Sequence, residues 1–269
     1  MGWPEYWLYF KQERQMKKYI YFLFCMFIFH SCDKEKLFDG PNYFEDNFES
    51  YASLNDALLP DETFWSFTQL TNEFNRISVD TTKAHSGKKS LKFDAKQSND
   101  ELLSKCSIAK QNMAFWEGET IRISTWYFIQ GTQSLNWLFL MDVEERTPIG
   151  AGPGMRLALV DNKLRIEYKF NEKDITQALG QEVDFPRDQW VELILEIKLS
   201  QQNKGSVILS QNGQRIIDSQ NNRTLPKDLL YFQQGTKGMY SSCEIGITAN
   251  TKDTDLILWV DDIMFEKVN

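Results

Sequence analysis

Short segments in which apolar and polar residues alternate run through most of the chain and constrain its fold more than any other feature. Residues 191–199, for example, have the sequence VELILEIKL. A period of two places successive side chains on opposite faces of a β-strand, one face buried and the other in water. The clearest segments of this kind are residues 89–95, 120–130, 135–143, 154–160, 163–170, 189–199, 205–211 and 256–265.

Turn signals separate several of these segments. Asp161-Asn162 lies between two of them, and Asn212-Gly213 follows another. Such dipeptides favour the tight turns of β-hairpins, whose two strands are antiparallel. Since long helical patterns are few, the sequence predicts an all-β fold, a predominantly antiparallel sandwich or jelly roll.

One predicted strand, residues 120–130, has two distinct faces. A strand with two such faces is expected to pack one of them on the core, while the other lines a groove. The apolar face consists of Ile121, Ile123, Tyr127 and Ile129, and the mixed face of Arg122, Ser124, Trp126 and Phe128.

The N-terminal region has the pattern of a secretory signal. Met16-Lys17-Lys18 is basic, residues 19–29 (YIYFLFCMFIF) are apolar, and His30-Ser31-Cys32 follows. An apolar run this short falls below the roughly 20 residues that a membrane-spanning helix needs. The cysteine directly after the run resembles the lipobox of bacterial lipoproteins, which implies that Cys32 is lipidated and begins the mature chain. The alternative is a buried apolar strand in an N-terminal extension.

These observations predict the domain organisation. Residues 1–31 are an upstream extension plus the signal peptide, with Met16 as the expected start, residues 32–42 a polar tether, and residues 43–269 a single β-sandwich domain. A lipidated cysteine implies anchoring in the bacterial cell envelope, at the outer membrane or cell surface.

Charge and cysteine content narrow the classes of partner. The net charge of −8 disfavours nonspecific attraction to nucleic acid or to an anionic membrane surface. Once Cys25 leaves with the signal and Cys32 is lipidated, Cys106 and Cys243 remain in an oxidising compartment. They form either a disulfide or two separate buried thiols. His85 is the only histidine after the signal, which excludes a multi-histidine zinc site.

Four passages together resemble the concanavalin A-like jelly roll of extracellular glycan-acting proteins. Residues 84–93 (AHSGKKSLKF) are similar to a stretch common in carbohydrate-binding modules and heparin-lyase-like polysaccharide lyases. Residues 44–49, 190–214 and 246–263 resemble the opening strand, a tryptophan-led strand with its following turn, and the final strands. The resemblance implies a β-sandwich with a polysaccharide or oligosaccharide as ligand.

A sugar-binding groove needs aromatic faces for C–H surfaces and planar polar groups for hydroxyls. Arginine also suits a uronate carboxylate. The alternative is that the candidate side chains listed next belong to ordinary solvated strand faces. The candidate glycan-binding residues are Arg122, Trp126, Asp142, Glu144, Arg156, Arg165 and Lys169.

The resemblance also implies lyase chemistry, in which a glycan is cleaved by β-elimination. β-Elimination needs a base, a group that neutralises the uronate carboxylate, and an acid for the leaving oxygen. The related families use histidine or tyrosine as base and acid, so the catalytic candidates are His85, Tyr127 and Tyr168. Residues 231–235 (YFQQG) resemble the YFKxG strand of alginate lyases, with Gln233 in place of its lysine.

A structural calcium ion is a further expectation from related sandwiches. In these an acidic first strand and a late aspartate meet at one edge, and calcium takes six to eight oxygen ligands. The candidate ligands are Glu45 and Asp262.

Three functions are therefore weighed. The first is an envelope-anchored lipoprotein that recognises an extracellular polysaccharide through a groove of the sandwich. The second is a polysaccharide lyase that cleaves a uronate-containing glycan. The third is a non-catalytic scaffold that binds another envelope protein.

Overall fold

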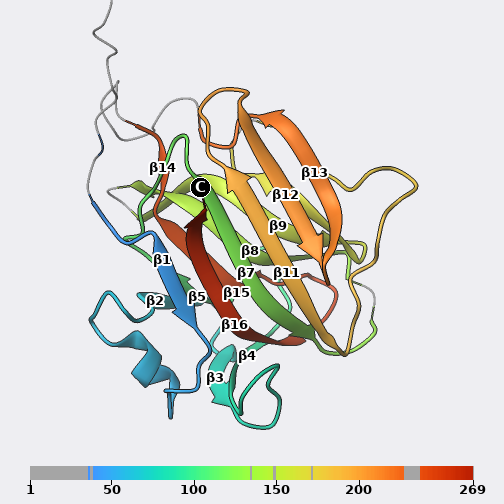
Figure 1. The fold of residues 1–269 in the computed structure, drawn as a ribbon. Coiled ribbons are helices and arrows are strands. Elements are labelled where there is room, and N and C mark those ends of the chain that lie inside the picture. Colours follow the sequence, from blue (N-terminus) through green and yellow to red (C-terminus); the bar gives the residue numbers. More distant parts are fainter. Residues whose placement is uncertain are drawn as a thin grey trace, which may run out of the picture. The chain divides into compact units, whose positions relative to one another are not determined.

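The structure, a computed structural model, describes residue 36 and residues 39–133, 135–147, 150–170, 172–226 and 237–268. Residues Lys36–Asn269 form one compact unit. In it two antiparallel sheets pack face to face around a shared apolar core (Figure 1). The predicted all-β sandwich, a jelly roll, is confirmed.

The first sheet has eight strands among the described residues. Its order is β13-β12-β11-β7-β16-β4-β3, and β1 pairs with β16 beside this path. The strands are β1 (Tyr43–Asp46), β3 (Arg76–Asp80), β4 (Ser90–Ala95), β7 (Thr120–Ile129), β11 (Trp190–Lys198), β12 (Gly205–Gln211), β13 (Gln214–Asn222) and β16 (Leu256–Val268).

The second sheet has six strands in that part of the chain, in the order β10-β9-β8-β15-β5-β2. A two-stranded piece and a short 3₁₀ helix complete the fold. The second-sheet strands are β2 (Phe67–Leu70), β5 (Cys106–Lys110), β8 (Trp137–Thr147), β9 (Gly150–Val160), β10 (Lys163–Tyr168) and β15 (Ser242–Ala249); the other elements are β6 (Phe115–Trp116), β14 (Met239–Tyr240) and η1 (Leu54–Leu58).

Every segment predicted from alternation contains a strand, and both predicted hairpin turns are present. Asp161 and Asn162 have φ of 48° and 61°, and Asn212 and Gly213 have φ of 50° and 75°. Two successive positive φ angles are typical of a type I′ turn, which asparagine, aspartate and glycine adopt at low cost. The pattern therefore predicted local pairing as well as strand type.

The core lies between the sheets, where the apolar faces of the strands meet. β7 shows the pattern clearly: Ile121, Ile123, Tyr127 and Ile129 are all buried, as its alternation predicted. They pack in one cluster with residues of the second sheet such as Leu157. Burial of this apolar surface is the main stabilising contribution to the fold.

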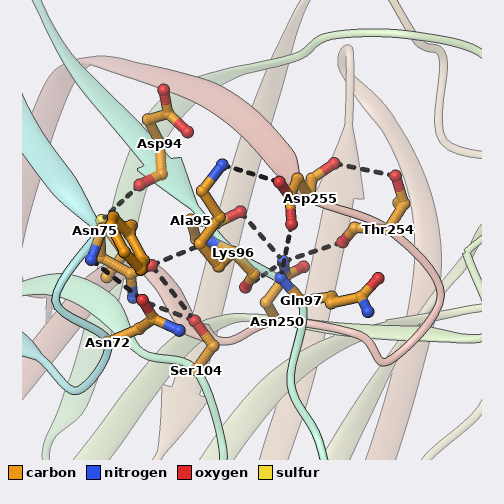
Figure 2. A network of polar contacts seen from close by, with 12 residues as sticks. Asn72, Asn75, Asp94, Ala95, Lys96, Gln97, Ser104, Asn250, Thr254 and Asp255 are labelled. Carbon is orange, nitrogen blue, oxygen red and sulfur yellow. Dashed lines mark hydrogen bonds and ion pairs between the residues drawn. The ribbon is translucent and has the colours of Figure 1, made fainter.

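A buried polar network fixes the loops at one end of the sandwich (Figure 2). The Nδ2 group of Asn250 donates to the carbonyls of Ala95, Lys96 and Thr254 at 3.3, 2.8 and 3.1 Å. Nearby, the Nδ2 group of Asn75 donates to Ser104 Oγ at 3.0 Å. Because buried carbonyls away from water need a donor, these amides hold several loops in one arrangement.

A β-bulge interrupts β8 and changes which of its side chains face the core. In its pairing with β9 the register shifts between Phe139 and Met141, so Leu140 is the extra residue. The hydroxyl of buried Tyr127 donates to the carbonyl of Leu140 at 2.8 Å. The bulge carbonyl is thereby satisfied from the opposite sheet.

Cys106 and Cys243 are two separate buried thiols in this structure. On β5, Cys106 pairs with Ile247, whereas Cys243 pairs with Lys110. Cys243 is four residues along β15 from Ile247, the residue opposite Cys106. Four residues along a strand correspond to roughly 13 Å, far beyond the reach of a disulfide. Of the two predicted alternatives, the structure has the unbridged one.

Candidate functional site

Five charged side chains gather on the outer face of the second sheet. β8 supplies Asp142 and Glu144, β9 supplies Arg156, β15 supplies Glu244, and Lys169 follows β10 directly. The neighbours of these residues along the strands point into the core, so alternation turns the charged residues outward. We call this set the charged face.

Ion pairs connect the charged face across three strands. Arg156 Nε lies 2.8 Å from Asp142 Oδ1, and Lys169 Nζ contacts a Glu144 oxygen directly. Lys169 Nζ also lies 3.7 Å from Asp142 Oδ2. Two cations therefore face two neighbouring carboxylates of one strand.

The network continues toward β5 and β2 through Glu244, which is the register partner of Asp142. Ser107 Oγ donates a hydrogen bond to Glu244 Oε1, and Gln69 Nε2 donates to Glu244 Oε2 at 3.4 Å. Lys105 in turn donates to Gln69 Oε1 at 2.9 Å. Glu244, Ser107 and Gln69 were missed because their strands were not among the segments predicted from the sequence, although CEIGIT alternates.

The carboxylates of the charged face are buried although they lie on an outer surface. Asp142, Glu144 and Glu244 are only 1%, 3% and 3% exposed. Burial raises the pKa of Glu244 and the charge of Asp142 raises it further, while the Ser107 hydrogen bond, Lys105 and Lys169 lower it. Buried carboxyl groups with such perturbed titration are common at functional sites.

One atom of this face lacks a hydrogen bond. Among the described residues, Asp142 Oδ2 is buried and has no hydrogen-bond partner. An acceptor left in this state is costly unless something donates to it. A sugar hydroxyl is a suitable donor, so the charged face is equipped to take part in binding.

The structure brings together five of the seven predicted glycan-binding residues. Arg165 on β10 is paired with Glu167, which is the register partner of Arg156, so Arg165 joins the four predicted residues of the charged face. Arg122 and Trp126 lie instead on the outer face of the first sheet. Arg122 pairs there with Glu196 and Glu266 at 2.8 and 3.1 Å. The single predicted groove is thus divided between opposite sides of the sandwich.

His85 also lies on the first sheet, away from the charged face. Its ring stacks on Trp126 with 3.6 Å between centroids, and its Nδ1 lies 2.7 Å from Asp262 Oδ2. Its backbone N–H donates to Asp261, whose pKa burial raises to about 6. These contacts attach the loop after β3 to β16, so His85 has a structural position and is not next to the charged face.

The two tyrosines among the predicted catalytic residues, Tyr127 and Tyr168, face the core. Tyr127 is fully buried, and burial raises its pKa. Tyr168 is half-buried against the core, where the centroid of its ring lies 5.1 Å from that of Phe170. Burial, with the charges of Glu172 and Asp174, raises the pKa of Tyr168. The prediction for Tyr127 is wrong because its ring is enclosed between the sheets.

The predicted calcium ligands do not fit a calcium ion. Glu45 and Asp262 line one open cavity of about 560 Å³. However, Glu45 accepts a hydrogen bond from Tyr43, and the two oxygens of Asp262 contact His85 and Ser86. No group of three or more His, Cys, Asp or Glu side chains that could hold a metal ion occurs in the described part of the chain. Calcium binds through oxygens, and those of Asp262 are already held by His85 and Ser86.

The fold is shared with several solved structures. The endo-β-1,4-glucuronan lyase of the fungus Trichoderma reesei superposes with a TM-score of 0.62 at 13% identity, covering 85% of this chain and 95% of that one. The cellulose-induced protein Cip1 gives 0.57 at 17% identity, covering 82% and 96%. The alginate lyase Aly36B gives 0.58 at 10% identity, covering 86% and 99%. Identities this low show a common fold.

The sequence itself matches a family model. No curated protein is similar enough to match the chain. The model described as polysaccharide lyase matches residues 61–264, which contain both sheets except β1 and the end of β16. The match spans most of the 269 residues and includes every residue of the charged face. This chain belongs to the polysaccharide lyase family.

Proposed function

We propose that the protein is a polysaccharide lyase that cleaves a uronate-containing polysaccharide on the charged face. The observation that carries the proposal is the paired arrangement of Lys169 and Arg156 with Glu144 and Asp142. Membership of the polysaccharide lyase family supports it.

β-Elimination requires three tasks at one uronate unit. Lys169 neutralises the carboxylate of the sugar, which makes the proton on the adjacent carbon more acidic, while Arg156 stays paired with Asp142. Glu144, which contacts Lys169, accepts this proton. The C–H electron pair becomes the new C=C bond as the glycosidic C–O bond breaks.

The leaving oxygen needs a proton, which Glu244 is placed to supply. It lies opposite Asp142 in the neighbouring strand, and burial raises the pKa of its carboxyl group. The proton lost from carbon is thus balanced by one gained at oxygen. We assign proton transfer to carboxyl groups because these are the groups that Lys169, Arg156 and Ser107 contact in the charged face.

We choose the substrate panel from the activities of the structural neighbours, a glucuronan lyase and an alginate lyase. The chain without residues 1–31 is incubated with glucuronan, alginate and mixed uronate polysaccharides, and the ultraviolet absorbance of the unsaturated product is recorded. We expect product from at least one uronate polymer and none from neutral cellulose oligosaccharides. Retention of a uronate polymer without any product would refute cleavage and leave a binding protein.

For localisation, we propose that Cys32 carries a lipid that anchors the protein in the bacterial envelope. Cys32 lies outside the described residues, and no helix in the described part is long and apolar enough to span a membrane. Acyl chains anchor a protein by burying their CH₂ groups in the bilayer. Cys32→Ala is therefore expected to move the protein from the membrane fraction to the soluble fraction, measured after labelling with a palmitate analogue. Wild type that takes up no label contradicts this expectation.

A further inference from the structure

Two aromatic rings lie beside the charged face on the same side of the second sheet. Trp137 and Phe139 are half-buried, and their ring centroids are 4.9 Å apart with planes inclined by 35°. Neither ring belongs to the apolar core cluster of the described residues. We call Trp137 and Phe139 the ring pair.

The bulge in β8 is the reason that the ring pair faces outward. Before the bulge, Phe139 is the register partner of Ala158; after it, Asp142 is the partner of Arg156. Ala158 and Arg156 are two residues apart on β9 and therefore share a face. Strict alternation would have placed Phe139 with Met141 and Val143 in the core. Bulges commonly redirect side chains next to functional sites, and the Tyr127 hydrogen bond to Leu140 holds this one.

Arg156 connects the ring pair to the charged face. Its guanidinium carbon lies 3.9 Å from the Phe139 ring centroid, while its Nε lies 2.8 Å from Asp142. The register partners of Phe139 and Asp142 are two residues apart on β9, which corresponds to roughly 7 Å along a strand. One glycan chain lying along β8 therefore meets the ring pair and the charged face in succession.

We propose that the ring pair is a subsite for a neutral hexose, and that the substrate combines uronate with neutral sugars. This inference rests on the proposed function and names the class of its substrate. The apolar C–H face of a neutral hexose packs on an aromatic ring, and its hydroxyls suit Asp142 and Arg156.

A second uronate suits this position poorly. Arg156 is already paired with Asp142. The two cations of β10 that lie across β9 from the ring pair, Lys163 and Arg165, are paired with Asp184 and Glu167. A uronate carboxylate placed there loses water and meets the nearby charge of Asp142. Neutral hexose at the ring pair and uronate at Lys169 are thus the better match to the charges.

The test is affinity electrophoresis of wild type and three variants in gels that contain a polysaccharide. The gels hold either a polymer of uronates alone (alginate, glucuronan) or a polymer that combines glucuronate with neutral sugars (deacylated gellan). We expect wild type to be retarded more by the mixed polymer. Trp137→Ala is expected to weaken that retention by roughly five- to tenfold, and Trp137→Tyr, which keeps a ring, to retain most of it.

Trp126→Ala is the matched control because Trp126 lies on the opposite sheet, and its retention is expected to equal that of wild type. Circular dichroism of each variant confirms the fold. Equal retention of Trp137→Ala and wild type, or tighter binding of the polymers of uronates alone by wild type, overturns the subsite. Loss of retention in Trp137→Ala without any lyase product supports the subsite and refutes only cleavage. Formation of lyase product together with unchanged retention of Trp137→Ala supports cleavage and refutes the subsite.

Discussion

Lys169→Ala is expected to lower the rate of unsaturated product formation by about 10²–10³-fold. Lys169 contacts Glu144 and lies 3.7 Å from Asp142, so its removal leaves two buried carboxylates without that cation. The uronate carboxylate then loses its neutralising charge, and Glu144 loses the cation that it contacts. Losses of this size are typical when one preorganised electrostatic contact is removed. The measurement is kcat/KM on the best substrate of the panel.

Three variants separate this effect from general damage. Lys169→Arg keeps the charge and is expected to recover part of the rate. Glu144→Gln removes the proposed base and is expected to lower kcat more than it raises KM. His85→Ala, on the opposite sheet, is expected to change the rate by less than about twofold. Full activity in Lys169→Ala, or complete loss in His85→Ala, contradicts the assignment of the site.

Trp65→Ala is expected to lower the free energy of unfolding by about 3–5 kcal/mol. Trp65 is 1% exposed, and its ring contacts Phe44, Phe48 and Phe265 at 5.1, 6.3 and 6.1 Å between centroids. Its indole N–H also donates to Asp46 Oδ2 at 2.7 Å. The substitution leaves a cavity beside β1 and removes a buried hydrogen bond.

Urea unfolding followed by circular dichroism measures this loss. Trp65→Phe keeps a ring but removes the donor to Asp46, so it is expected to lose less than the alanine variant. Leu70→Ala is the surface control, because Leu70 is exposed, and it is expected to change stability by about 0.5 kcal/mol or less. A stability of Trp65→Ala equal to that of Leu70→Ala contradicts the packing described here.

Strand type and the charges of the site were available from the sequence. Strand type is a local property, so residues 135–143 and 154–160 were predicted as strands, and Asp142 and Arg156 were named as candidates on them. Asp142, Glu144, Arg156, Arg165 and Lys169 were accordingly predicted as candidates, and the structure brings them together.

Strand order is not local, and here the predictions were incomplete. Trp126 and His85 have the residue types of a sugar-binding or catalytic site, but β7 pairs with β11 and β16 in the first sheet. Alternation fixes which side of a strand a residue occupies, whereas only long-range pairing decides which sheet contains the strand. The same limit applies to Tyr127, whose face was correctly predicted as apolar but whose hydroxyl partner, Leu140, lies in the other sheet.

The sequence by itself determined the all-β class, the hairpin turns and the charged residues, because each depends on neighbours along the chain. Only the tertiary structure decided that Trp137 and Phe139 face outward beside Asp142. By counting residues, both rings share the parity of Met141 and Val143, which are buried in the core. One extra residue, Leu140, reverses that parity, and a bulge is stable only because β9 and Tyr127 satisfy its backbone across the fold.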